Sequence, residues 1–302
     1  MKFKLEWREQ TLATIFLVPA AIGLLIFYYY PIAYTFVLSA FDLNHTADLT
    51  PQAFIGLKNY ATVLASAPFW GSIRFTLFFT VVSVCLELSV GMVLALASYW
   101  VWPRLTGLVR VIIIIPWAIP QIIEASIWKW MYNADVGMIG DLMVRLGLVS
   151  QPPLFLADPN LAQWSVIVAY VWKGAAFAAI FLMGGLALVP QELHDAAKVD
   201  GARAWRRFWT VTVPMLMPTI LVVLLFQTID GIRVFDIVYG LTGGGPGTAT
   251  DTLSSFAYKY YFKFVEYGIG SAYAVVTFLL VLAASLIYIR RVQAHFRFKG
   301  IE

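Results

Sequence analysis

The sequence is short of cysteine and of charge, and each shortage excludes a class of protein. Cys85 is the only cysteine among 302 residues, so an internal disulfide and a metal site built on cysteine pairs are both excluded. Because Cys85 lies in an apolar run, we expect it to be a buried small apolar side chain. Charged residues make up 13% of the chain, about half the share in an average soluble protein. The net charge is only +4 and no long basic block occurs, so no nucleic-acid partner is predicted.

The sequence also lacks the motifs of common catalytic and nucleotide-binding sites. Its three histidines, His45, His194 and His295, show no His-Glu-x-x-His spacing, so we predict neither a metal site nor a catalytic residue. The glycines at 243–247 are not followed by the Lys-Ser or Lys-Thr of a phosphate-binding loop. We therefore expect a turn there, and no cofactor or ATP site in this chain.

Apolar residues are abundant, at 61% of the chain. A membrane-spanning helix needs about 20 mostly apolar residues. Such stretches lie at about 11–38, 72–98, 108–131, 164–187, 216–240 and 269–289. They must be helical, because lipid cannot satisfy free backbone groups, so an all-α integral membrane protein is predicted. Pro31, Pro116 and Pro120 are expected to kink or break their spans. The first stretch exceeds a signal-peptide core of roughly 7–15 residues, so we expect it to be a retained span.

The basic residues indicate the orientation of these spans. They gather in alternate loops and at both ends, whereas the other loops hold fewer, mainly Lys58, Arg145, Lys259 and Lys263. The basic-rich segments contain Lys2, Lys4, Arg8, Arg104, Arg110, Lys198, Arg203, Arg206, Arg207, Arg290, Arg291, Arg297 and Lys299. The positive-inside rule therefore predicts that both termini are cytoplasmic.

The loop between the fourth and fifth spans reads as two short amphipathic helices joined at a bend. Pro190 and Glu192 suit a helix start, and Gly201 suits a left-handed helix end. The small apolar side chains of Leu193, Ala196 and Ala197 share one face of the first helix. The second piece carries aromatic residues at helical spacing with arginines beside them. From periodicity alone, the pair either lies among lipid headgroups or inserts its apolar face into a groove on a partner protein.

A resemblance to a known family favours the second interpretation. Asp195-Ala196-Ala197, three residues, Gly201, nine residues and then Val211-Thr212-Val213-Pro214 resembles the EAA signature of binding-protein-dependent ABC importer permeases. Here Asp195 replaces the glutamate of that signature. Shorter stretches, among them Phe54-Ile55-Gly56-Leu57-Lys58-Asn59-Tyr60 and Leu241-Thr242-Gly243-Gly244-Gly245-Pro246, are similar to carbohydrate importers of the maltose-permease type.

The resemblance implies the fold and the partners. It implies an ABC type I importer permease fold in which residues 1–302 form a single transmembrane permease domain. The loop at about 188–214 is then the coupling helix that docks on an ATP-binding subunit. The partners are a second permease, two ATP-binding subunits that bind the ATP, an extracytoplasmic sugar-binding protein, a sugar and the lipid bilayer. The residues expected to couple are Glu192, Leu193, Asp195, Ala196, Ala197, Asp200, Gly201 and Arg203.

Ionisable groups inside spans indicate the transport path, because they are costly in lipid. They include Glu87 and Lys173. Gln227, Asp230, Arg233 and Asp236 recur every three residues and are expected on one face of the fifth helix. With Tyr239, and with Glu124 and Trp128 on the third span, they are the candidate path residues. The same charges suit either a sugar-binding wall or a salt-bridge network that seals this helix against the partner permease.

The predicted function is ATP-driven import of a sugar, a disaccharide or short oligosaccharide, by a subunit that is not itself an enzyme. The spans hold no cluster of basic residues for a phosphate. Two alternatives stay open: a polytopic membrane enzyme acting on a lipid-linked substrate, and a permease of the same family for a non-sugar solute. A stand-alone channel or carrier would differ from all of these by working without ATP-binding partners.

Overall fold

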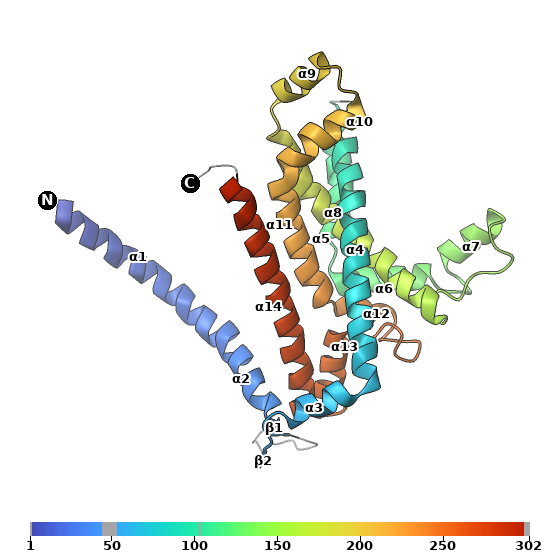
Figure 1. Cartoon of the computed structure of the whole chain (residues 1–302). Helices are drawn as coiled ribbons and strands as arrows, with labels where there is room; N and C mark the ends of the chain where they lie inside the picture. Colours follow the sequence, from blue (N-terminus) through green and yellow to red (C-terminus); the bar gives the residue numbers. More distant parts are fainter. Residues whose placement is uncertain (1, 44–52, 103, 299–302) are drawn as a thin grey trace. The chain divides into compact units, whose positions relative to one another are not determined.

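The computed structural model describes residues 2–43, 53–102 and 104–298, and helices make up most of it (Figure 1). The chain forms two compact units, Met1–Ser66 with Ala257–Val276 and Ala67–Phe256 with Thr277–Glu302. Five described helical segments are long and apolar enough to cross a membrane, or six if one bent pair counts as a span. The predicted all-α membrane fold with about six spans is confirmed.

The first unit contains α1 (Lys2–Leu24), the π-helical turn η1 (Leu25–Tyr29), α2 (Tyr30–Ser39) and α3 (Lys58–Ala65). Strands β1 (Phe41–Asp42) and β2 (Ala53–Phe54) pair antiparallel between α2 and α3. The buried amide of Asn59 donates to the carbonyls of Ser39 and Phe41, both at 2.9 Å. These bonds fix the start of α3 against the end of α2.

Two prolines in the spans follow π-helical turns. Pro31 comes directly after η1 and Tyr30, and Pro214 follows η2 (Phe208–Thr212) and Val213 in the same way. A proline lacks an N–H and its ring crowds the preceding turn, and a π turn accommodates it by widening the helix by one residue. The chain therefore keeps a continuous helix through both positions, so that of the kink or break expected at Pro31, a break does not occur.

The second unit is built around α8 (Pro159–Ala187), which packs against α4 (Ala67–Trp100), α5 (Thr106–Ala118) and α11 (Val213–Ile232). Small residues allow the close approach: Ala169, Ala175, Ala178 and Ala179 are at most 1% exposed. At Gly91 of α4, a methyl group would clash with Ala178 of α8. The core lies where these helices cross.

The remaining elements of the second unit are short, apart from the C-terminal helix. They are α6 (Gln121–Met131), α7 (Met138–Arg145), α9 (Gln191–Val199), α10 (Ala204–Arg207), α12 (Asp236–Leu241) and α13 (Leu253–Tyr258). After the π turn η3 (Lys259–Lys263), α14 (Tyr267–Phe298) starts in the first unit and continues in the second. The Tyr288 and Thr228 hydroxyls, 3.0 Å apart, join α14 to α11 within the second unit.

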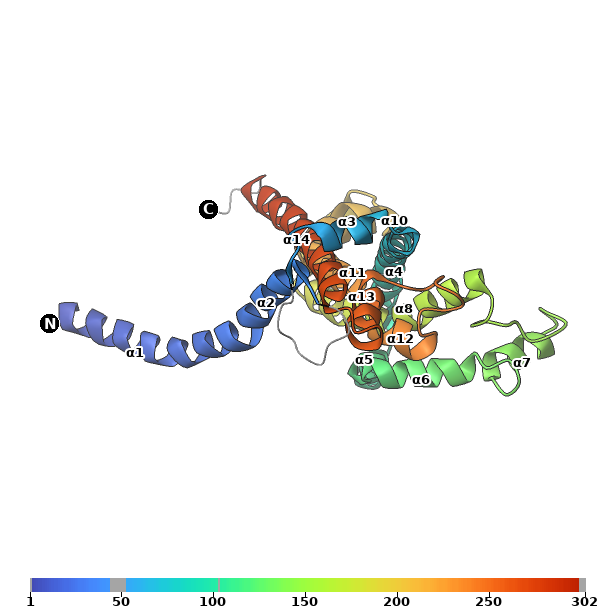
Figure 2. The ribbon, with the colours of Figure 1, turned by 90° about the horizontal axis from the view of Figure 1, so that it is seen from below.

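The third predicted span is broken at Pro120, as its sequence indicated. Helix α5 ends at Ala118, α6 starts at Gln121, and the two axes differ by 97°. Figure 2 shows α5 almost end-on while α6 runs across the view. Pro116, by contrast, stays inside α5.

Two expectations need correction. The fifth span runs from Ala204 to Ile232 and not from 216 to 240, because α10 continues through η2 into α11 and the chain leaves the helix at Arg233. The second short piece of the loop is therefore the start of a span. Cys85 is exposed on α4, so the expected buried role is wrong; its side chain faces away from the contact of α4 with α8.

Candidate functional site

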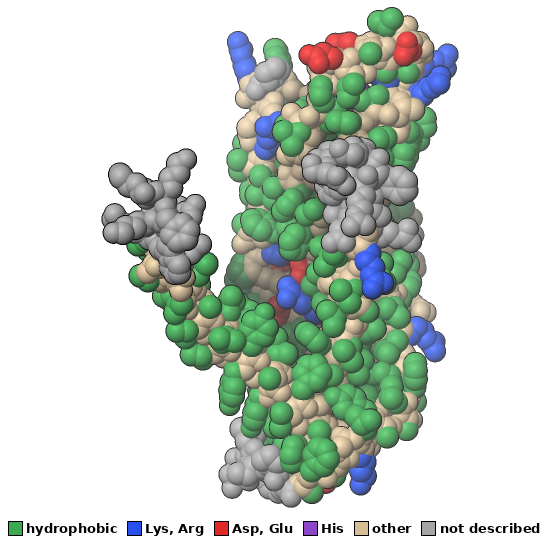
Figure 3. Space-filling model, turned by 60° about the vertical axis from the view of Figure 1, so that its left-hand side comes forward, with side chains coloured by type: hydrophobic (Ala, Val, Ile, Leu, Met, Phe, Trp, Pro, Cys, Tyr) green, Lys and Arg blue, Asp and Glu red, His purple; other side chains and the backbone are tan. Residues whose placement is uncertain are grey.

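The second unit contains a polar cavity of about 550 Å³. In Figure 3, basic and acidic side chains gather in a hollow bordered by hydrophobic surface. The walls come from α4, from the break between α5 and α6, from α8, and from α11, α12 and their junction. The lining residues are Glu87, Trp117, Gln121, Tyr170, Lys173, Gly174, Phe177, Gln227, Asp230, Arg233, Val234, Phe235 and Asp236.

The junction between α11 and α12 places an ion pair in this cavity. Helix α11 ends at Ile232, and α12 begins with Asp236 in its first turn. Arg233 donates through Nε to Oδ1 of Asp230 at 3.0 Å and through Nη2 at 2.5 Å. Both side chains remain more than half exposed. A ligand in the cavity therefore meets a partly solvated pair whose charges already offset each other.

The single helical face expected for Gln227, Asp230, Arg233 and Asp236 is wrong, because the helix is interrupted. The carbonyl of Val234 accepts from the Thr252 hydroxyl at 3.0 Å, so a distant segment satisfies a backbone group freed by the break. Arg233 pairs with Asp230, and no ion pair of Arg233 with Asp236 is formed among the described side chains. All four residues nevertheless line the same cavity.

Lys173 of α8 stabilises the break between α5 and α6. Its ammonium group donates to the carbonyl oxygens of Trp117, at 2.8 Å, and of Ile119. A helix end leaves carbonyls without intrahelical partners, and Pro120 offers no N–H to satisfy them. Lys173 thus stabilises this wall of the cavity, and its ammonium group donates hydrogen bonds to backbone carbonyls of the same chain.

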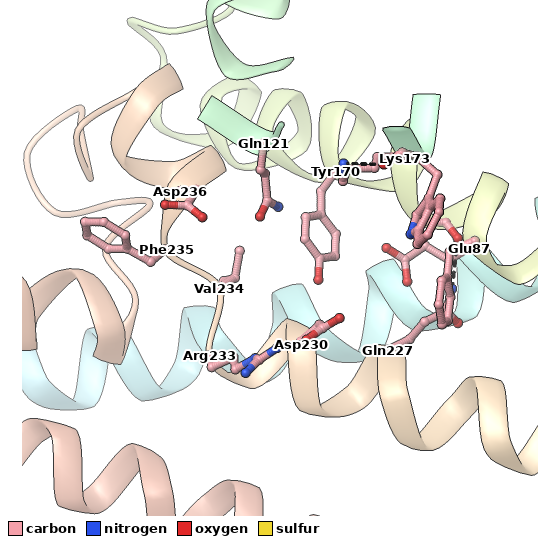
Figure 4. A pocket seen from close by; sticks show the side chains of 13 residues that line it. Glu87, Gln121, Tyr170, Lys173, Gln227, Asp230, Arg233, Val234, Phe235 and Asp236 are labelled. Carbon is pink, nitrogen blue, oxygen red and sulfur yellow. Dashed lines mark hydrogen bonds and ion pairs between the residues drawn. The ribbon is translucent and has the colours of Figure 1, made fainter. Parts of the chain in front are cut away.

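Glu87, Gly174 and Gln227 bring α4, α8 and α11 together at one end of the cavity. Gln227 donates through Nε2 to the carbonyl of Gly174 at 3.1 Å. Glu87 is completely buried and occupies the space that a side chain at Gly174 would take. Figure 4 shows Glu87 and Gln227 at one end of the cavity, with Phe235 and Asp236 at the other.

The candidate path residues are only partly gathered at the cavity. Gln227, Asp230, Arg233 and Asp236 line it, whereas Glu124, Trp128 and Tyr239 do not. Glu124 is buried in the first turn of α6. Trp128 packs on Trp172 and Tyr132, and Tyr239 stacks on Phe235 with ring centroids 5.2 Å apart.

Sequence reasoning missed the aromatic part of the lining: Trp117, Tyr170 and Phe177. Each lies in a long apolar run, where an aromatic residue that faces a cavity and one that faces lipid look the same. The available signal was the charge of Glu87 and of Lys173, each inside an apolar span. Both belong to the ionisable groups that indicate the transport path, and both line the cavity.

The loop after α8 has the geometry expected of a rigid surface projection. Helix α9 ends at Val199 with Asp200 as its C-cap, and the next residue, Gly201, has φ +76°. The N–H of Gly201 bonds to the carbonyl of Lys198, and the N–H of Ala202 to that of Ala197, both at 2.9 Å. These bonds form a Schellman motif. Arg207 donates to the carbonyl of Ala202 at 3.0 Å, which ties α10 to the bend.

The residues expected to couple lie on the surface of this loop. None of the residues of α9 is buried, and the apolar side chains of Leu193 and Val199 are 42% and 88% exposed. Asp195 pairs with Lys198 at 2.7 Å on the same helix. The hydrogen bond from Lys198 lowers the pKa of the Asp195 carboxyl below its usual range. Glu192, Ala196, Asp200, Gly201 and Arg203 are also exposed, and Ala197 is half-buried.

The glycines at 243–247 form a turn, as expected. Gly243, Gly244 and Gly247 all have positive φ, which residues with a side chain rarely adopt. The hydroxyl of Thr250 donates to the carbonyl of Gly245 at 2.7 Å and also contacts the hydroxyl of Thr242. The turn thus closes on its own chain after α12.

Comparisons with known proteins agree with this geometry. The family described as binding-protein-dependent transport system inner membrane component matches residues 87–295. The trehalose/maltose transport system permease protein MalF of Thermococcus litoralis is 40% identical over 290 residues, 95% of each chain. The trehalose transport system permease protein SugA of Mycobacterium tuberculosis is 38% identical and covers 93% of this chain and 89% of its own.

Solved structures show the same fold. One chain of a bacterial ABC transporter involved in the import of the acidic polysaccharide alginate superposes with a TM-score of 0.83. The superposition covers 97% of this chain and 99% of that chain, with 23% of residues identical. A second structure, of the alginate transporter in complex with a periplasmic protein bound to an alginate pentasaccharide, gives a TM-score of 0.81 over 94% of each chain. At this level of identity the likeness concerns the fold.

Proposed function

The chain belongs to the family of binding-protein-dependent transport system inner membrane components, and we propose that it is one of two permease subunits of an importer for a neutral disaccharide or short oligosaccharide. As a member of this family it is a multi-pass membrane protein and an ABC transporter permease, not an enzyme. ATP is bound by partner subunits. The whole of residues 1–302 acts as one permease domain in this proposal.

The observation that carries the proposal is the cavity between the spans. Its volume of about 550 Å³ falls within the roughly 300–1,000 Å³ of typical small-molecule sites. Carboxylates, an amide and a tyrosine hydroxyl can bond to sugar hydroxyls, and the rings of Trp117, Phe177 and Phe235 offer apolar faces. Both cations of the lining, Lys173 and Arg233, already bond to groups of this chain, so an anionic ligand finds no unengaged cation there. The relatives named for trehalose and maltose support the same substrate class.

Coupling in this proposal runs through α9. The exposed apolar residues Leu193 and Val199 suit insertion into a groove on an ATP-binding subunit. Acidic side chains lie over α9 at the top of Figure 3, where they can orient the contact. The Schellman motif at Gly201 gives the projection a fixed shape, which a docking element requires.

Purification from native membranes tests the function. A tagged chain should bring along a second permease and two ATP-binding subunits, and the reconstituted complex with its binding protein should take up trehalose or maltose. Uptake should require ATP on the side that carries α9. Uptake without ATP by the chain alone, or uptake only of a non-sugar solute, would contradict the proposal.

The orientation is tested by labelling. In a Cys85→Ala background, cysteines at the exposed positions Leu148 and Thr248 should react with an impermeant thiol reagent outside intact cells. Cysteines at Leu105 and Arg203, also exposed, should react only after the cells are opened. Reaction at Arg203 in intact cells would place α9 outside and would exclude docking of a cytoplasmic ATP-binding subunit.

A further inference from the structure

Three helices of the second unit meet at a point where hydrogen-bond acceptors are left without donors. Gly174 has no side chain, which admits the Glu87 carboxyl against α8, and its carbonyl accepts the amide nitrogen of Gln227. The other atom of that amide, Oε1, is buried without a hydrogen-bond partner within the described chain. Both carboxyl oxygens of Glu87 are in the same condition.

Unpartnered buried acceptors are unusual. Nearly all buried polar side-chain atoms in folded proteins have a hydrogen-bond partner, and an exception indicates strain, a functional role, or a place for a water, an ion or a ligand group. The two nearby cations offer no remedy here, since Lys173 bonds to the carbonyls of Trp117 and Ile119, and Arg233 to Asp230. Because Glu87 and Gln227 both line the cavity, a hydrogen-bond donor that enters the cavity can supply the partner that their oxygen atoms lack.

We propose that Glu87 and Gln227 form the hydroxyl-binding end of the sugar cavity, with Glu87 accepting a hydrogen bond from one particular hydroxyl of the substrate. This assignment rests on the proposed function. It names Glu87 as a specificity-determining residue, and it names Gly174 as the residue that makes room for its carboxyl. In the described conformation the carboxyl is closed off from solvent. The sugar therefore reaches it when α4, α8 and α11 shift relative to one another, as alternating access requires.

The proposal also accounts for the cavity's asymmetry. Between the two ends shown in Figure 4, the pair of Asp230 and Arg233 is already satisfied by its own contact. At the end of Glu87 and Gln227, three acceptor oxygens are unsatisfied. A sugar bound along the cavity is thus held most specifically at the end of Glu87 and Gln227.

The test uses the reconstituted transporter complex with trehalose, maltose and their monodeoxy analogues, each lacking one hydroxyl. For one analogue, we expect kcat/KM of the wild-type complex to fall by about 10- to 100-fold, as when a buried acceptor loses its donor. Glu87→Met keeps similar volume but removes the acceptor. It should lower kcat/KM for the parent sugar and bring that analogue to within about threefold of it, leaving the other analogues ranked as before.

Gly174→Ala provides a second, independent variant, because the added methyl group displaces the Glu87 carboxyl. It should cause the same selective loss of discrimination. Ser89→Ala is the matched control, since Ser89 is an exposed residue on the same helix, and it should behave as the wild type. The thermal stability of the Glu87→Met complex should be equal to or higher than that of the wild type, because an unpaired buried carboxyl is removed.

The outcomes separate the two levels of the proposal. An equal loss for every analogue, or unchanged discrimination in both variants, would overturn the role of Glu87. A Glu87→Met complex that no longer assembles would show a structural role and would overturn it as well. If the wild-type complex takes up none of these sugars, the proposed function itself fails.

Discussion

The second unit contains two regions with polar side chains, the cavity and the loop around α9. They differ in whether their side chains are held by contacts within the chain. In the cavity, charged groups are held by the chain itself: Lys173 by backbone carbonyls and Arg233 by Asp230. In the loop, α9 buries none of its residues, and Leu193 and Val199 face outward. Fixed cavity walls can select a ligand, whereas an exposed amphipathic helix with a capped end suits contact with another protein. In the proposed function, the cavity of this chain selects the ligand and α9 couples to a partner subunit.

Gly201→Val should have the largest effect, because it breaks the loop and leaves the cavity intact. Valine at φ +76° is strained, so α9 should lose its fixed direction. We expect sugar uptake to fall at least about tenfold, which corresponds to ~1.4 kcal/mol, with weaker co-purification of the ATP-binding subunits.

Gly147→Val is the matched control for this strain. Gly147 also has positive φ, +69°, and open space around it, but it follows α7 and is far along the chain from the loop. It should keep both uptake and association near the wild-type level. Equal losses in the two variants would assign the effect to strain in general and not to docking.

Lys173→Met should have the next largest effect, and it tests whether the chain itself holds the cavity wall. It leaves the carbonyls of Trp117 and Ile119 without their donor. The free energy of unfolding should fall by about 1–3 kcal/mol, measured as thermal stability of the complex. Lys173→Arg should recover part of the loss, and Lys129→Met, at an exposed site on α6, should cost little. Normal stability of Lys173→Met would show that the break needs no capping side chain.

Asp230→Asn and Arg233→Ala test the cavity side of this comparison, and we expect each to have a moderate effect on sugar uptake. Their ion pair is more than half exposed, so it contributes at most about 1 kcal/mol to stability. We expect assembly to persist while sugar uptake falls several-fold in each variant, as the cavity loses polar groups. Loss of assembly in both variants would instead support a salt-bridge network that seals α11 against the partner permease.

Asp195→Asn should have the smallest effect. The bond from Lys198 keeps the pKa of Asp195 below its usual range, so any stabilisation from the carboxylate is present above that range and is lost only in acid as it takes up a proton. The ratio of ATP-subunit binding between wild type and variant should therefore stay constant from about pH 6 to pH 8. A ratio that changes steeply over this interval would contradict the assignment of a low pKa.

The sequence was sufficient for features that depend on local chemistry. Run length predicted the spans, Gly201 predicted the left-handed end of α9, and Pro120 predicted the break in the third span. The end of α11 could not be predicted, because apolar residues such as Ile237 recur beyond Arg233 and the freed carbonyl of Val234 is satisfied by Thr252, 18 residues later. The aromatic part of the cavity lining could not be predicted for a similar reason. Tyr170 and Trp117 line one cavity only because α5 and α8 pack together. The roles of the predicted site residues stay predictions.

The continuous helix from Ala204 to Ile232 has a mechanical consequence. It carries Trp205 beside the loop at one end and Asp230 in the cavity at the other. At 1.5 Å per residue, its 29 residues follow a helical path roughly 43 Å long. Pro214 and Pro218 do not interrupt this helix. The π turn η2 accommodates Pro214, and α11 continues through Pro218. A displacement of the loop can therefore reach the cavity through one unbroken helical segment, which turns between α10 and α11 (Figure 1).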